Sequence, residues 1–171
     1  MFWQRNWQRS MKIKQIVDTD FINYKKPSMF ILFPYCTFKC DKENGCAVCQ
    51  NSILANQPTH TIELDKIVTM YEANPITRAI VCGGLEPMDS FDELSALLSD
   101  FRRRCADDFV IYTGYKEEEI QDKLEILKLY ENVIVKFGRY IPNEEPHFDP
   151  VLGIYLASNN QYAKQIGDIV G

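Results

Sequence analysis

The chain has 171 residues and 46% hydrophobic content, which is enough for one compact domain with a core that needs no disulfide staples. Its 19 basic and 24 acidic residues give a net charge of −5, which argues against nucleic acid as the main partner. The longest apolar runs fall far short of the roughly 20 residues that cross a bilayer, so we expect neither a membrane segment nor a secretory leader. A cytoplasmic location follows, in which six cysteines are better explained as metal ligands than as disulfides.

The first residues have a different character from the rest. Residues 1–10, "MFWQRNWQRS", contain both tryptophans and two arginines and show no apolar periodicity that continues. Two interpretations compete: an N-terminal extension that is disordered or faces a partner, or translation that starts at Met11. We expect a single domain over residues 11–171.

Strand-like and helix-like segments alternate along this domain. Helices are predicted at 64–73, at 116–130 and after Ser90, where Glu93 completes a capping box ahead of an apolar stripe. Residues 141–150 are predicted to form a proline-rich loop. Strands are predicted at 12–17, 28–33, 78–84, 108–114, 132–138 and, as the final strand, 151–158.

This alternation predicts an α/β fold built from βαβ units with a mostly parallel sheet. A complete eight-fold barrel takes about 250 residues, so the chain can form only an incomplete, open βα barrel or a doubly wound sheet. In both architectures the functional sites collect beyond the C-terminal ends of the strands. Four distinctive stretches fall there: the cysteine loop after 28–33, "GGLEPM" at 83–88, "TGY" at 113–115 and "KFG" at 136–138.

The cysteine loop contains four possible ligands with the spacing CX3CX5CX2C: Cys36, Cys40, Cys46 and Cys49. Four thiolates could form a closed tetrahedral zinc site. Three thiolates could instead bind a [4Fe-4S] cluster and leave one iron with an open position. The spacing alone does not decide between them.

The neighbouring motifs favour the cluster. A cysteine loop after one strand and a Gly-Gly-Glu-Pro-like loop after the next resemble the radical S-adenosylmethionine (radical SAM) superfamily. Within it, the chain resembles the activating enzymes of anaerobic ribonucleoside-triphosphate reductase. The narrower resemblance rests on the Gln50-Asn51 pair after Cys49, "YTGY" at 112–115, "KFGRY" at 136–140 and "LASNNQ" at 156–161.

The resemblance implies a fold of radical SAM type and a set of site residues. The metal ligands would be Cys36, Cys40 and Cys49, with Cys46 as the alternative third ligand. The family motif CX3CX2C thereby becomes CX3CX8C, an insertion that costs only on the order of 1 kcal/mol in loop closure. Leu85 also separates the two glycines from Glu86. The implied S-adenosylmethionine-binding residues are Gly83, Gly84, Glu86, Pro87, Thr113, Gly114 and Asn51.

The implied activity is that of an oxidoreductase that generates a glycyl radical. In this family a reduced cluster cleaves S-adenosylmethionine, and the 5′-deoxyadenosyl radical removes a hydrogen atom from a backbone glycine of the target. The expected partners are the large subunit of the reductase and an electron donor such as a flavodoxin. No catalytic side chain beyond the cluster ligands is needed. His60 lies in a predicted solvated loop, "PTHT", and His147 in the proline-rich loop, so both are expected at the surface.

Several other residues have a structural explanation that competes with a role in the site. Cys82 and Cys105 are expected to be small core residues, the latter on the Ser90 helix. Tyr112 and Tyr115 are expected to pack at a strand end. Lys136, Arg139 and Asn23 could each serve a site or be structural. The competing functions are a zinc-binding module without enzymatic activity and a radical SAM enzyme with another substrate.

Overall fold

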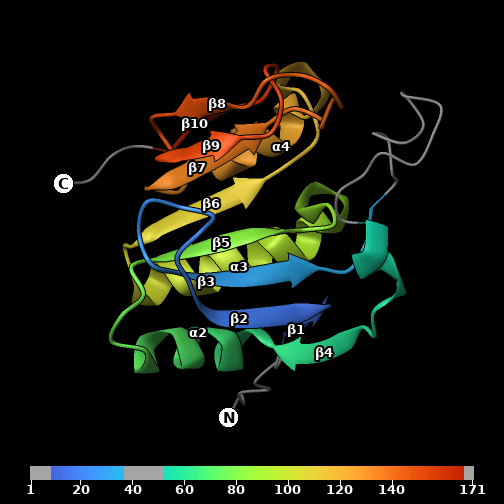
Figure 1. Cartoon of the computed structure of the whole chain (residues 1–171). Coiled ribbons are helices and arrows are strands. Elements are labelled where there is room, and N and C mark those ends of the chain that lie inside the picture. The colour runs from blue at the N-terminus through green and yellow to red at the C-terminus, as the bar shows by residue number, and fades with distance from the viewer. Residues whose placement is uncertain (1–8, 37–51, 168–171) are drawn as a thin grey trace, which may run out of the picture.

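The structure is a computed structural model, and it describes residues 9–36 and 52–167. Its centre is a six-stranded sheet in which four parallel strands are flanked by an antiparallel strand at each edge (Figure 1). In the described residues this sheet does not close into a barrel. The expected α/β architecture with a mostly parallel sheet is therefore confirmed. The strands, in spatial order, are β10 (Tyr162–Gln165), β7 (Val133–Phe137), β6 (Asp108–Tyr112), β5 (Ala79–Gly84), β3 (Ser28–Phe33) and β2 (Gln15–Asp20).

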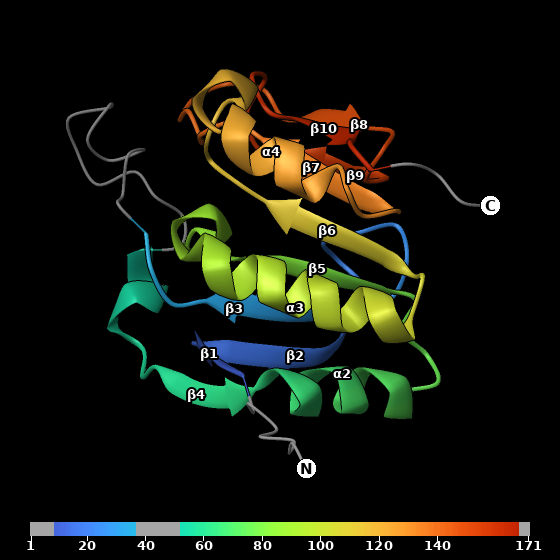
Figure 2. The same cartoon turned by 180° about the vertical axis from the view of Figure 1, so that it is seen from behind.

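Within residues 9–36 and 52–167, three helices cover one face of this sheet: α2 (Leu64–Ala73), α3 (Phe91–Arg104) and α4 (Gln121–Leu127). Figure 2 shows α3 lying across β3 and β5, and α4 lying across β7. Successive residues of a strand point to opposite faces, so each inner strand contributes to two cores. In β5, Ile80 and Cys82 join the core beneath the helices, whereas Ala79 and Val81 join a smaller cluster on the other face.

The other face is covered only in part, by the β2–β3 loop and by a hairpin of β8 (His147–Asp149) and β9 (Ile154–Leu156) (Figure 1). The N–H of Lys25 in the loop donates to the carbonyl of Leu152 in the hairpin at 2.8 Å. Tyr24 and Leu152 are buried together in the smaller core cluster. Because none of the helices that the structure describes lies on this face, it is where a cavity can form.

The segment predicted as one strand at 12–17 is two strands. β1 (Ser10–Ile13) pairs with β4 (His60–Glu63) in a separate small sheet, whereas β2 pairs with β3. The chain changes sheets at Lys14, whose N–H donates to the carbonyl of Leu32 at 2.7 Å. Residues 1–8 of the expected extension lie outside the described residues.

Two helix predictions were partly wrong. Ser90 makes no capping hydrogen bond, because a 3-10 turn, η2 (Pro87–Ser90), leads directly into α3, and the Glu93 carboxylate instead accepts the N–H of Lys12 at 2.9 Å. The helix predicted at 116–130 is a short turn, η3 (Glu117–Glu119), followed by α4. Ile120 separates the two in a non-helical conformation and is buried in the core.

The strand predicted at 151–158 shortens to β9, and β10 follows it, so β9 is not the final strand. The expected loop at 141–150 contains β8. The predictions for β3 and α2 are confirmed with the same bounds. In the part of the chain that the structure describes, no helix is both long and apolar enough to span a membrane.

The isolated cysteines and histidines follow the expectations in part. Cys82 is fully buried, as expected, and Cys105 lies one residue beyond the end of α3 and is half-buried. His60 is exposed but belongs to β4 rather than to a loop. His147 is half-buried on β8 rather than at the surface, because the hairpin folds onto the sheet.

Candidate functional site

A cavity of about 330 Å³ lies on the sheet face that the helices leave open. Its walls come from segments far apart in the chain: β3 contributes Phe30 and Leu32, β6 contributes Tyr112, and β7 contributes Lys136. The β8–β9 hairpin and the β2–β3 loop close its sides. This volume lies in the range of small-molecule and cofactor sites.

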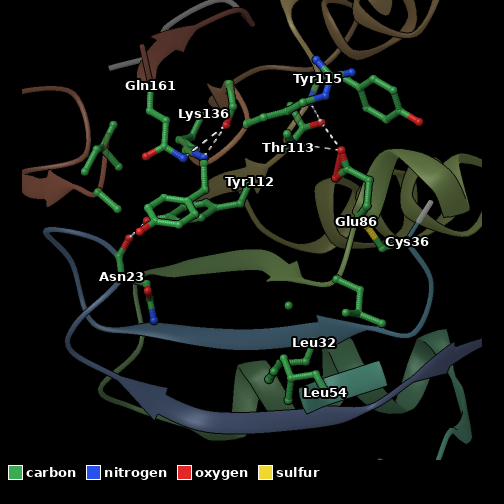
Figure 3. A pocket seen from close by; sticks show the side chains of 18 of the residues that line it. Asn23, Leu32, Cys36, Leu54, Glu86, Tyr112, Thr113, Tyr115, Lys136 and Gln161 are labelled. Atoms are coloured by element: carbon green, nitrogen blue, oxygen red, sulfur yellow. Dashed lines mark hydrogen bonds between the residues drawn. The ribbon is translucent and has the colours of Figure 1, made fainter. Parts of the chain in front are cut away.

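One predicted cluster ligand lies at this cavity. Cys36 follows β3 by three residues and lines the cavity wall (Figure 3). Leu54, in the 3-10 turn η1 (Ser52–Asn56), lines it as well, so the chain on both sides of residues 37–51 meets the cavity. The other predicted residues of this loop, Cys40, Cys46, Cys49 and Asn51, lie outside the described residues. In the described ranges no three His, Cys, Asp or Glu side chains are grouped as a metal site.

The glycine pair is required by a close approach between strands. At Gly84, φ is +86°, and a Cβ would lie 2.8 Å from the Cα of Leu32. At Gly83, a Cβ would lie 2.9 Å from the tip of the Phe30 ring. These glycines let β5 run tightly beside β3 at the floor of the cavity.

The extra residue Leu85 does not carry Glu86 away from the cavity. The backbone continues to pair beyond the end of β3: the N–H of Leu85 donates to Phe33 at 3.4 Å, and that of Glu86 donates to Tyr35 at 2.8 Å. Both Leu85 and Glu86 line the cavity wall. Pro87 is buried at the start of η2 and is not part of that wall.

Glu86 is the most unusual polar group of the cavity, with only 5% of its surface exposed. Its Oε1 accepts hydrogen bonds from the Thr113 hydroxyl and, at 3.1 Å, from the N–H of Gly114. Its Oε2 is buried and has no hydrogen-bond partner among the described residues. Burial raises the pKa of Glu86 to about 7, while the bond from Thr113 acts in the opposite direction. A buried acceptor of this kind lowers the stability of the folded protein unless a ligand donates a hydrogen bond to it.

A cation faces the same cavity. The Lys136 ammonium is buried, donates to the carbonyl of Gly138 at 3.0 Å and lies 5.9 Å from the centre of the Tyr112 ring. Gln161 donates to the same carbonyl at 3.3 Å. Figure 3 shows Glu86 and Cys36 toward one end of the cavity and Lys136 and Gln161 toward the other. The cavity therefore presents a carboxyl group and an ammonium group to one ligand.

Arg139 and the "LASNNQ" stretch have a structural role that the sequence did not reveal. Arg139 lines the cavity wall, but its guanidinium pairs with both oxygens of Glu119 at 2.7 and 2.8 Å. The side chain of Asn160 donates to the carbonyl of Arg139 at 2.8 Å, and Ser158 and Gln161 continue this network. The motif thus fastens the chain after β7 into the cavity wall.

Asn23 also lines the cavity, but its side-chain amide donates to Asp20 at 3.0 Å. Its backbone carbonyl accepts a hydrogen bond from the Tyr112 hydroxyl. Tyr115 donates its hydroxyl to Asp89 at 2.5 Å. The apolar wall was missed by sequence reasoning, although the alternation of β3 already placed Phe30 and Leu32 on one face. No local pattern marked Leu54, Ile154 and Tyr155, whereas Tyr140, Leu156 and Ala157 belong to the motifs "KFGRY" and "LASNNQ" but were not predicted as site residues.

The fold and the site together define an α/β protein with a cavity whose wall includes a carboxyl group, an ammonium group and a cysteine. A family model described as a 4Fe-4S single cluster domain matches residues 27–161, and the chain belongs to this family. The match includes the cysteine loop, Glu86 and Gln161. Searches of the curated proteins and of the solved structures gave no match. The predicted iron–sulfur cofactor is thus supported, and a [4Fe-4S] cluster is favoured over zinc.

Proposed function

We propose that the protein is a radical SAM oxidoreductase that activates the large subunit of an anaerobic ribonucleotide reductase. The observation that carries the proposal is Oε2 of Glu86, which is buried in a cavity that Cys36 also lines and has no hydrogen-bond partner in residues 9–36 and 52–167. Membership in the 4Fe-4S single cluster family supplies the cluster. The motifs "YTGY", "KFGRY" and "LASNNQ" support the narrower assignment, because all three contribute to the wall of this cavity.

The residues that are present fit the cofactors. Cys36 would hold the cluster together with Cys40 and Cys49, with Cys46 as the alternative third ligand. With S-adenosylmethionine bound, the cluster would supply the one-electron reduction that yields the 5′-deoxyadenosyl radical. Oε2 of Glu86 would accept a hydrogen bond from the ammonium group of that cofactor, and Lys136 would pair with its carboxylate. The glycine pair would permit a close backbone approach to the ligand.

The remaining residues would shape the reaction space. Tyr112, Ile154 and Leu156 present apolar surface to the cavity, so they would exclude water around a reactive ligand. Thr113 and Gly114 would hold the carboxylate of Glu86. The proposal also includes a target glycine on the reductase subunit, an electron donor such as a flavodoxin, and a cytoplasmic location. They rest on the resemblance to the activating enzymes.

The decisive experiment is an anaerobic assay of iron, sulfide, zinc and 5′-deoxyadenosine after addition of dithionite and S-adenosylmethionine. We expect about four irons, as a [4Fe-4S] cluster requires, and formation of 5′-deoxyadenosine. The variant Cys36→Ala should lose the iron, whereas the matched control Cys82→Ala should keep it, since Cys82 lies in the core under the helices. Parallel Cys46→Ala and Cys49→Ala variants identify the third ligand.

Other outcomes would overturn the proposal at different levels. Tightly held zinc without iron after reconstitution would contradict the enzyme assignment altogether. Electron paramagnetic resonance detects a glycyl radical on the added reductase subunit. If 5′-deoxyadenosine forms but this radical does not, the radical chemistry is retained and the proposed target is refuted. The variant Glu86→Gln should keep its iron but lose the formation of 5′-deoxyadenosine.

A further inference from the structure

Thr113 is almost fully buried beside Glu86, with 2% of its surface exposed. It follows β6, and its own N–H donates to the carbonyl of Lys136 at 2.8 Å, which ties it to β7. A threonine hydroxyl has one hydrogen to donate, and here it is donated to Oε1 of Glu86. The same hydroxyl oxygen accepts the N–H of Tyr115 at 3.0 Å. The direction of its hydrogen bonds is therefore set by the backbone.

This arrangement treats the two oxygens of the carboxylate differently. Oε1 is held by two donors, the Thr113 hydroxyl and the Gly114 N–H, whereas Oε2 has no partner in the described part of the chain. Rotation of the carboxylate would break both bonds, so the free oxygen is kept in one place. The hydroxyl of Thr113 has no second hydrogen with which to bind a ligand directly.

We propose that Thr113 is a positioning residue, which fixes the carboxylate of Glu86 so that Oε2 alone accepts a hydrogen bond from an ammonium-bearing ligand. This assignment deepens the proposed function and rests on it where the ligand is S-adenosylmethionine. It also changes the expectation for Thr113, which acts through Glu86 rather than by donating a hydrogen bond to the ligand. Gly114 contributes a backbone N–H, which any residue except proline could supply. Of the two donors to Oε1, only the Thr113 hydroxyl can therefore be removed by a simple side-chain substitution.

The test compares two ligands on the anaerobically reconstituted protein. S-Adenosylmethionine has an ammonium group, and 5′-methylthioadenosine has the same nucleoside but no amino acid part. The variant Thr113→Val, which has nearly the same shape, should bind S-adenosylmethionine about tenfold more weakly and 5′-methylthioadenosine equally well, in line with the loss of a hydrogen bond to a charged group. Thr113→Ser should restore binding to within about threefold. In a Glu86→Gln background, Thr113→Val should have no further effect, because no carboxylate remains to be oriented.

An unchanged affinity of Thr113→Val for S-adenosylmethionine would overturn the proposal, and so would an equal loss for both ligands, which would indicate a structural role. If the wild-type protein binds neither ligand, the proposed function fails first. The positioning role is then tested without a ligand by urea unfolding of the two single variants and the double variant. Strictly additive changes would refute coupling between Thr113 and Glu86, whereas non-additive changes would support it.

Discussion

Arg139, two residues beyond β7, and Glu119, in η3, form a two-point ion pair in which each of the two terminal guanidinium nitrogens donates to one carboxylate oxygen, at 2.7 and 2.8 Å. The Arg139 side chain is 6% exposed and that of Glu119 is 30% exposed, so the pair is mostly shielded from water. Glu119 also accepts the N–H of Lys116 at 2.9 Å. The pair therefore fastens the loop after β6 to the cavity wall after β7.

Removal of Arg139 should destabilise the protein, because it leaves a half-buried carboxylate without its cation. We expect Arg139→Met to lower the free energy of unfolding in urea by about 2 kcal/mol. The matched control is Lys164→Met, which breaks a longer pair with Glu117 at 3.3 Å, in which Lys164 is 56% exposed. Its cost should stay below about 1 kcal/mol. Equal losses in the two variants would show that burial of the Arg139 pair contributes nothing extra.

Gly84 should be irreplaceable for stability, whereas Gly114 should not. Alanine at 84 would combine a positive φ with a contact of 2.8 Å to the backbone of Leu32, which cannot move aside easily. Gly84→Ala should cost about 2 kcal/mol or more in urea unfolding. At Gly114 the nearest atom to an added Cβ is the Cγ of Arg139, at an ordinary 3.6 Å, so Gly114→Ala should change stability by less than about 1 kcal/mol. A tolerated Gly84→Ala would argue against the close packing of β5 on β3.

Glu86 should make stability depend on pH in the protein freed of iron. Its pKa is raised by burial from 4.5 to about 7, so the folded protein holds a proton that the unfolded chain has already released over this range. Stability contributed by this group is present below about pH 4.5 and is lost as the pH rises through 7. The full shift corresponds to roughly 3 kcal/mol. The variant Glu86→Gln, measured by urea unfolding from pH 4.5 to 8, should lack this decline, and parallel curves for the two proteins would refute the raised pKa.

Lys14 should hold the segment that follows the cysteine loop. Its ammonium donates to the carbonyls of Gln57 at 2.6 Å and Ala55 at 3.4 Å, and to the hydroxyl of Thr59 at 2.9 Å. Lys14→Met should speed amide hydrogen exchange across residues 52–59 about tenfold, as expected for the loss of a charge-assisted anchor. The control Lys128→Met breaks an exposed pair with Glu125 at the end of α4, which lies over β7 and thus toward the opposite edge of the sheet from β2, and should leave this segment unchanged. Unaltered exchange in Lys14→Met would mean that the segment is held by other contacts.

The sequence predicted elements well where hydrophobic pattern and local chemistry agree. The continuous apolar run of β3 and the helical spacing before Asn74-Pro75 gave β3 and α2 with the correct bounds. The change of sheets at Lys14 was invisible, because both halves of that segment have strand-like side chains and only the tertiary bond to Leu32 separates them. β10 was missed because a strand of four residues carries too little pattern.

The candidate site was predicted in its charged part and missed in its apolar part. Gly84, Glu86, Thr113 and Gly114 follow two neighbouring parallel strands, so topology alone brings them together. The hairpin residues of β9 reach the cavity through a tertiary fold that has no local signal. The partners of Arg139 and Asn160 depend in the same way on contacts between distant segments.

Cys36 and Gln161 line one cavity although most of the described chain separates them. During synthesis the cysteine loop leaves the ribosome early, and the segment that completes the wall leaves it much later. Gly84 and Glu86 are synthesised between these two stages, so the residues at the Glu86 end of the cavity precede those of the opposite wall. The wall of the cavity is therefore complete only after the segment around Gln161 has been synthesised.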